Sequence, residues 1–269
     1  MQAISCPACG SAKYRVFSTR GRNRIVVCVG CRLFYVNPIP ERGALNARVE
    51  GSELYTEDQL RKVEFFRRRA EALFTRVESR IGVGRVLDVG CAIGTGLVVA
   101  RERGWEGVGI ELSQGSVRIA LEAGLDVRSV PMEESDFPGG YFDLVTLNHV
   151  LEHVPHVESF LGEVRRVLSP DGLLFVAVPN VNAWLRFLRG ERYAWTFQDD
   201  HFLHFSPRTL RRLLRRCGFR TLEIETSRWR DFHQPVETRS LPFRTVNRVV
   251  EMLGMGVEIF CLARPADVA

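Results

Sequence analysis

Four cysteines near the N-terminus have the spacing of a metal site. Cys6 and Cys9 are separated by two residues, Cys28 and Cys31 repeat that spacing, and 18 residues lie between the two pairs. Each Cys-x-x-Cys turn can direct two thiolates to one point, and a tetrahedral Zn²⁺ ion accepts four ligands. Four protein ligands leave no open position, so we predict a structural zinc ion in a ribbon module over residues 1–42.

The stretch VLDVGCAIGTG, residues 86–96, has the pattern of a nucleotide-binding turn. An apolar run reaches Asp88, and Gly90 and Gly94 follow it before a helix-like segment, which predicts a strand, a tight turn and a helix. The glycine spacing of a dinucleotide site is absent, and so is the Gly-Lys-Ser/Thr of a P-loop. Glu111, at the end of the next predicted strand, can accept hydrogen bonds from ribose hydroxyls. We therefore predict a ligand with a ribose and an anionic tail but no pyrophosphate.

Two histidines are candidate proton acceptors. His149 ends a predicted strand, and His201 lies in the segment FQDDHFLHF together with Asp199, Asp200 and His204. Imidazole is the side chain best suited to proton transfer near neutral pH. His153 and His204 lie nearby in the sequence. The alternative for these two is that His153 packs in the interior and that His204 orients the helix that follows it. We recognise no metal-ligand spacing beside these histidines, so metal-assisted chemistry is not expected.

Residues 180–206 lack regular periodicity and exceed the usual loop length of about 6 residues. We predict that this segment forms a lid, and Trp184, Tyr193 and Trp195 could give the lid an apolar wall. His233 could also line the mouth of the site.

The elements that must position these residues alternate between strand-like and helix-like runs from residue 85 onward. Such alternation is typical of an α/β fold with helices on both faces of a mainly parallel sheet. We predict one domain over residues 82–269. Its seven strands are expected at residues 85–91, 106–111, 126–130, 141–150, 172–180, 220–227 and 256–264. Residues 43–81 are predicted to form a helical linker because apolar residues recur there at spacings of three and four. That helix would dock the ribbon side onto the sheet; a dimer seam is the alternative.

Composition sets the broad class. The chain has 269 residues, 45% of them hydrophobic, and a net charge of +5. Acidic and basic residues alternate without a dense basic stripe, which disfavours a nucleic-acid footprint. No apolar run approaches the roughly 18 residues of a membrane helix, and the N-terminus lacks an apolar signal core. We therefore expect a cytoplasmic protein, and the odd number of seven cysteines argues against a disulfide framework.

Five successive motifs resemble those of class I S-adenosylmethionine-dependent methyltransferases. They are VLDVGCAIGTG at 86–96, GIELS at 109–113, MEE at 132–134, FDLVTLNHVLEHV at 142–154 and RRVLSPDGLLFVAVPN at 165–180. The resemblance implies a Rossmann-like sheet that binds S-adenosylmethionine. The four-cysteine ribbon, which ends in CRLFYVNP, is similar to the N-terminal module of a bacterial branch of these enzymes, many of them associated with sugars, surface polysaccharides and natural products.

The resemblance also implies roles for single residues. Asp88, Gly90 and Gly94 would surround the methionine end of the cofactor, and Glu111 would bind the ribose with Leu112 beside the adenine. Met132 and Glu133 would meet the adenine edge, and Asn148 and His149 would approach the sulfonium. Ala92 replaces the commoner glycine of the turn. The alternative for Asp88 and Glu111 is that they merely cap turns or helices.

Three functions are compatible with these expectations. The first is methyl transfer to a small-molecule acceptor, a sugar or natural-product intermediate. The second is RNA methylation with the ribbon binding the nucleic acid, for which the ribbon offers basic residues at Lys13, Arg15, Arg20, Arg22, Arg24 and Arg32. The third is a scaffold that binds S-adenosylmethionine without catalysis.

Overall fold

The computed structural model describes residues 1–20, 23–39, 53–184, 197–198, 200–227, 250 and 253–266. Within these residues the chain forms two compact units. The first unit comprises Met1–Pro40, His149–Glu158 and Val176–Ala263, and the second comprises Glu41–Asn148, Ser159–Phe175 and Arg264–Ala269.

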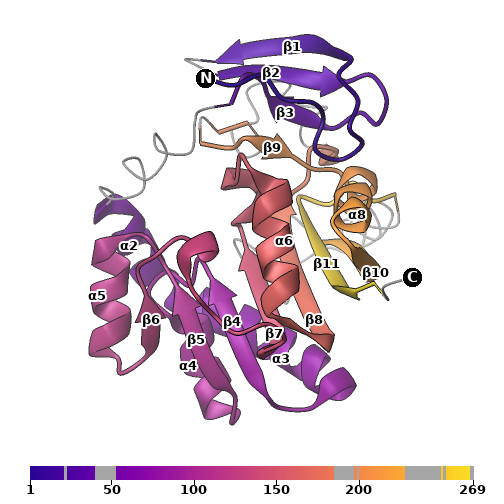
Figure 1. Ribbon diagram of the computed structural model, residues 1–269. Coiled ribbons are helices and arrows are strands. Elements are labelled where there is room, and N and C mark those ends of the chain that lie inside the picture. Colours follow the sequence, from indigo (N-terminus) through magenta and orange to yellow (C-terminus); the bar gives the residue numbers. More distant parts are fainter. Residues whose placement is uncertain are drawn as a thin grey trace, which may run out of the picture. The chain divides into compact units, whose positions relative to one another are not determined.

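The N-terminal part of the first unit is an antiparallel sheet of four strands in the order β1-β2-β3-β9 (Figure 1). The strands are β1 (Tyr14–Arg20), β2 (Asn23–Cys28), β3 (Phe34–Val36) and β9 (Leu203–His204). Strand β9 comes from a distant part of the sequence and pairs with β3 through Phe34 and His204. The sequence did not indicate this pairing, because a strand of two residues has no readable periodicity.

A second, mixed sheet has seven strands in the order β10-β11-β8-β7-β4-β5-β6, which confirms the predicted α/β fold. The strands are β4 (Arg85–Val89), β5 (Glu106–Ile110), β6 (Asp126–Arg128), β7 (Phe142–Asn148), β8 (Leu168–Pro179), β10 (Phe219–Ser227) and β11 (Glu258–Pro265). Strand β4 pairs in parallel with both β5 and β7. The chain order reverses between β4 and β7, and ligands bind at the carboxyl edge of such sheets at this kind of point.

Helices connect the parallel strands. They are α4 (Thr95–Glu102), α5 (Gln114–Glu122) and α6 (Val157–Val167), with the short 3₁₀ turns η2 (Met132–Glu134) and η3 (Leu151–His153). Right-handed crossovers put α4 and α5 on one face of the sheet and α6 on the other. Helix α8 (Pro207–Arg216) begins directly after Ser206, whose hydroxyl accepts a hydrogen bond from the Thr209 amide and so caps the first turn.

Two boundaries differ from the sequence prediction. The helical segment before the sheet is broken at Lys62 into α2 (Glu53–Arg61) and α3 (Val63–Ile81). Phe74 and Val77 of α3 are buried, and α3 packs against α4. Strand β8 (Leu168–Pro179) begins four residues before the strand that was predicted at 172–180. Apolar periodicity locates elements better than it locates their ends.

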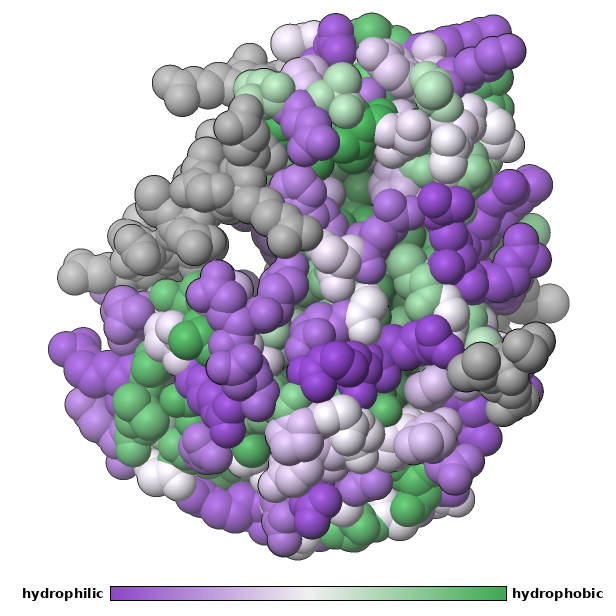
Figure 2. All heavy atoms as spheres, in the orientation of Figure 1, coloured by the Kyte–Doolittle hydropathy of each residue, from purple (hydrophilic) through white to green (hydrophobic). Residues whose placement is uncertain are grey.

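Hydrophilic and hydrophobic residues are interspersed on the face that Figure 2 shows. Single exposed apolar side chains, such as Leu121 of α5 at 52% exposure, are normal for a water-facing surface. Among the described residues, the helices are too short or too polar to cross a membrane.

Candidate functional site

The glycine turn after β4 adopts the backbone geometry that its sequence predicts. Gly90 and Gly94 both have positive φ angles, 72° and 80°, a region that favours glycine. A Cβ atom at Gly94 would lie 2.2 Å from the Leu125 side chain, so a larger residue there would have to displace Leu125 as well as adopt a strained backbone. Ala92 also has a positive φ of 50°, which gives a physical reason for the commoner glycine at that position.

Asp88, at the end of β4, holds a carboxylate where the strand order reverses. Its Oδ1 atom accepts a hydrogen bond of 2.5 Å from the hydroxyl of Thr146 on β7. Burial raises the pKa of Asp88 to about 6, the negative charge of Glu111 adds to that rise, and the Thr146 hydrogen bond opposes it. The ionised form is therefore kept at a cost in free energy and is suited to a cationic ligand group.

Glu111, directly after β5, is 6% exposed. Its Oε2 atom accepts from the amide of Ala92 at 2.9 Å, and its Oε1 atom accepts from the amides of Leu112 and Ser113 at 2.8 and 2.7 Å. The carboxylate thus ties the glycine turn to the start of α5. Two carboxylate oxygens offer about four acceptor positions. The three main-chain amides occupy three of them, which leaves capacity for a ligand hydroxyl while the turn stays in place.

The other residues that the resemblance implied for the cofactor differ in exposure. Met132 is 2% exposed, Glu133 is exposed and Leu112 is partly exposed. Asn148 ends β7, and its Oδ1 atom lies 3.5 Å from Arg69 Nη2 of α3. The sequence analysis missed Arg69, because a single arginine on the charged side of an amphipathic helix carries no distinguishing signal.

His149 is held between two buried carboxylates in the first unit. Its Nδ1 lies 3.1 Å from Glu152 Oε1 and its Nε2 lies 2.7 Å from Glu258 Oε1, and the two glutamates are 1% and 0% exposed. Burial alone would lower the pKa of His149, but the Glu258 charge and the hydrogen bonds to both carboxylates raise it to about 9. The backbone at His149 has a φ of 56°, a strained value for a non-glycine residue.

His201 lies in a different group of side chains. It is 4% exposed, and its ring packs edge-on against that of His153, with centroids 4.7 Å apart. Ligand atoms of Glu152, His153 and His201 all lie within 4.8 Å of one another. The sequence showed no metal-ligand spacing here, because these three residues meet through folding rather than through a sequence motif.

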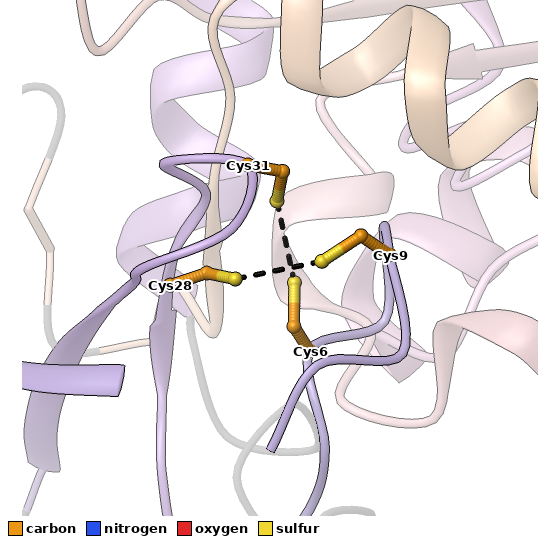
Figure 3. Close-up of side chains that lie close together, drawn as sticks. All are labelled: Cys6, Cys9, Cys28 and Cys31. Carbon is orange, nitrogen blue, oxygen red and sulfur yellow. Dashed lines mark hydrogen bonds between the residues drawn. The ribbon is translucent and has the colours of Figure 1, made fainter. Parts of the chain in front are cut away.

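The four N-terminal cysteines come together as their spacing predicted. Their sulfur atoms point toward a common centre (Figure 3), with Cys6 and Cys31 3.5 Å apart and Cys9 and Cys28 also 3.5 Å apart. Four sulfurs around Zn²⁺ at a distance of about 2.3 Å would lie about 3.8 Å from one another. The donor set and its size thus fit a tetrahedral zinc ion.

The two cysteine turns have matching backbones. Gly10 and Arg32 each follow the second cysteine of a pair, and both have positive φ angles of 73° and 70°. The Gly10 amide donates to the Cys6 carbonyl at 2.7 Å, and the Arg32 amide donates to the Cys28 carbonyl at 3.0 Å.

Residues 185–196 and 199 of the predicted lid, which include Tyr193, Trp195 and Asp199, lie outside the described residues, and so does His233. Trp184 is described, and its amide donates to the Met255 carbonyl at 3.0 Å. The apolar wall proposed for the lid therefore stays a prediction.

Comparison with known proteins bears on the fold and on the family. A family model for a methyltransferase domain matches residues 58–224. The ubiquinone biosynthesis O-methyltransferase of Bordetella avium is 33% identical over 149 residues, which are 50% of this chain and 61% of that protein. The chain thus matches less than two thirds of this curated relative's length.

Solved structures share the fold. A methyltransferase from Archaeoglobus fulgidus described as S-adenosylmethionine-dependent has a TM-score of 0.56 at 21% identity, covering 76% of this chain and 98% of that one. The 1,6-didemethyltoxoflavin-N1-methyltransferase of Burkholderia thailandensis, solved with bound 1,6-didemethyltoxoflavin and S-adenosylhomocysteine, has a TM-score of 0.54 at 16% identity. That match covers 94% of this chain and 100% of the other.

Proposed function

Because the chain belongs to the class I S-adenosylmethionine-dependent methyltransferase family, we propose that it transfers the methyl group of S-adenosylmethionine to a small-molecule acceptor. The observation that carries the proposal is the pair of carboxylates, Asp88 and Glu111, at the carboxyl edge of adjacent parallel strands beside a glycine turn. This edge of the sheet can bind a ligand that has a ribose, a cationic amino acid end and a short carboxylate tail.

In this proposal the two carboxylates have different partners. Glu111 accepts from the ribose hydroxyls, with Leu112, Met132 and Glu133 near the adenine. Asp88 pairs with the cationic groups at the methionine end, and binding such a cation favours its ionised form. Gly90 and Gly94 let the main chain approach that end of the cofactor.

Asn148 and Arg69 extend the proposed site along β7. The Arg69 guanidinium lies 3.5 Å from the Asn148 amide oxygen, so it brings a positive charge to the end of this strand. We propose that Arg69 attracts the carboxylate of the cofactor while Asn148 contacts the methionine end near the sulfonium.

For methyl transfer the protein mainly has to position the two reactants. Methyl transfer from a sulfonium is an in-line displacement in which the S–CH₃ bond breaks, the bond to the acceptor forms and a neutral thioether leaves. Holding the acceptor in line therefore supplies most of the rate enhancement. A hydroxyl or ammonium acceptor must also lose a proton.

His149 and His201 were the residues predicted for that proton. Both ring nitrogens of His149 face carboxylates, so we propose that His149 acts as a positioning residue, held in one orientation at the end of β7. His201 then remains the candidate closer to proton transfer, either directly or as a member of the group with Glu152 and His153.

The proposed acceptor class is a small molecule, with a sugar or natural-product intermediate as the specific choice. The support comes from similar proteins: one is named for ubiquinone biosynthesis, and a protein of the same fold was solved with bound 1,6-didemethyltoxoflavin. We propose that the four-cysteine module binds one structural zinc ion and that residues 1–42, 43–81 and 82–269 form a ribbon, a linker and a catalytic domain.

Radiolabelled methyl donor incubated with separate pools of nucleotide sugars, small metabolites and cellular RNA tests the proposal. We expect label in a small-molecule pool, and label in RNA alone would contradict the acceptor class. Calorimetry with S-adenosylhomocysteine and with a nicotinamide dinucleotide tests the cofactor. Binding of the dinucleotide but not of S-adenosylhomocysteine would refute the proposed site.

A further inference from the structure

We propose that Glu152, His153 and His201 bind one divalent transition-metal ion, at a site separate from the four-cysteine cluster. Each residue offers one ligand atom, and the three ligand atoms lie within 4.8 Å of one another. Two imidazoles and one carboxylate form a ligand set that suits divalent iron, cobalt and zinc. Three protein ligands leave positions open, which the oxygen atoms of a bound molecule can fill.

Glu152 supplies the strongest single argument. Its side chain is 1% exposed, and its Oε1 atom faces His149 Nδ1 at 3.1 Å. The other oxygen, Oε2, is buried and accepts no hydrogen bond. A buried carboxylate oxygen without a donor is costly, and a cation bound to Oε2 would remove that cost.

His153 has the hydrogen bond that metal-ligating histidines usually make. Its Nδ1 atom lies 3.2 Å from the main-chain carbonyl oxygen of Asp200. A carbonyl oxygen only accepts, so Nδ1 donates this hydrogen bond, and Nε2 of the neutral imidazole then has a lone pair available for a metal ion. Donation from one ring nitrogen to a carbonyl fixes the tautomer and orients the other nitrogen for a metal.

The segments that carry the ligands are joined without any metal. The Phe202 amide, next to His201, donates to the Glu152 carbonyl at 2.7 Å, and the His201 amide donates to the Gln198 carbonyl at 3.2 Å. The rings of His153 and His201 lie at 85° to each other. A site held in this way requires little rearrangement when an ion binds.

The charged groups around the site favour a cation. Asp200 Oδ2 lies 3.4 Å from His153 Nδ1. Glu258 faces His149 from the side of the ring opposite Glu152, so it offsets any positive charge on that imidazole. Carboxylates therefore outnumber cationic side chains among these neighbours.

The test is a Co²⁺ titration of the full-length protein purified with zinc in the ribbon, followed by calorimetry and by visible absorption. We expect one Co²⁺ per chain, bound at least about tenfold more weakly by Glu152→Gln and by His153→Gln. His156→Gln is the matched control, since it removes a histidine three positions from His153 and leaves the ligand set intact; its affinity should stay within about twofold of the original chain. Exchange of cobalt into the ribbon would be equal in all variants, so it cancels in the comparison.

Removal of a buried glutamate can unfold a chain, so circular dichroism accompanies each titration. His153 is 37% exposed, and its substitution tests the site even if Glu152→Gln does not fold. Absence of Co²⁺ binding in the original chain, or equal affinity in the original chain and His153→Gln, would overturn the proposal. No methyl donor or acceptor is present in this experiment, so its result is independent of the proposed function.

Discussion

Buried and partly buried carboxylates have two different kinds of partner in this protein. At the edge of β4 and β5, Asp88 and Glu111 accept hydrogen bonds from a hydroxyl and from three main-chain amides. Around His149, Glu152 and Glu258 share one imidazole. Among the described side chains, the first arrangement places two negative charges near each other with no cationic partner, whereas the second has the imidazole of His149 as its partner.

The difference separates two carboxylates whose charge has no cationic partner in the part of the chain that the structure describes from two whose charge an imidazole already offsets. The Asp88 pKa is raised, so the ionised carboxylate destabilises the folded chain until a cation arrives. The His149 pKa is also raised, by its two carboxylates, so here charge contributes to stability. An unfavourable charge such as that of Asp88 is expected at a binding site. An ion pair such as that of His149 with its two glutamates is expected where a residue stabilises the fold.

The largest expected effect comes from breaking the closed arrangement. His149→Leu leaves Glu152 and Glu258 buried without their shared partner, which costs about 3 to 5 kcal/mol in the free energy of unfolding. Urea denaturation measures the loss. His153→Leu is the control from the same 3₁₀ turn; since its partner Asp200 is 62% exposed, we expect a loss below about 1 kcal/mol. Equal losses of unfolding free energy in His149→Leu and His153→Leu would show that the two buried glutamates do not depend on His149.

For Asp88 we expect a change of the opposite sign, a gain in the free energy of unfolding when its charge is removed. Asp88 has a folded-state pKa of about 6 against an ordinary 3.8, so its favourable contribution is present below pH 3.8 and is lost as the pH rises through 6. Asp88→Asn keeps an acceptor for Thr146 and carries no charge. We therefore expect it to raise the free energy of unfolding at pH 7.5 by up to about 3 kcal/mol, with no gain at pH 4.

Asp143→Asn is the matched control for that variant. Asp143 also lies on β7, but its Oδ2 atom accepts from the Arg85 main-chain amide at 2.9 Å. Its loss should lower stability slightly. An Asp88→Asn protein that is less stable than the original chain at pH 7.5 would show that Asp88 is structural.

The sequence predicted the first arrangement much better than the second. Asp88 and Glu111 end strands with strong apolar runs, and the glycines between them need positive φ angles, so local physics specifies their place. Glu258 lies far along the chain, in the last strand, and joins His149 only through the strand order. Contacts between distant residues depend on the fold, so the sequence did not predict that His201 and His153 lie together. The four cysteines could be predicted because their spacing is regular.

Glu111 tests whether the cofactor edge binds a ribose at all. Glu111→Gln keeps the size of the side chain but loses its charge and turns an amide group toward one of the main-chain donors. We expect affinity for S-adenosylhomocysteine to fall by about 1 to 3 kcal/mol in calorimetry. Glu134→Gln is the control, because Glu134 is an exposed carboxylate in the neighbouring η2 turn; its affinity should not change. Unchanged affinity in Glu111→Gln would leave Glu111 with a turn-capping role alone.

Thr146 provides the smallest and most specific test of how Asp88 is kept ionised. Thr146→Val removes the hydroxyl that donates to Asp88 Oδ1 and conserves the shape of a side chain that is 5% exposed. Because that hydrogen bond lowers the pKa of Asp88, its loss should raise the pKa further and weaken cofactor binding by about 1 kcal/mol. The deficit should be larger at pH 6.5 than at pH 8.5, since Asp88 is ionised in both proteins at the higher pH. A deficit independent of pH would mean that Thr146 acts through packing, and Asp88 would then not be the group that meets the cationic end of the cofactor.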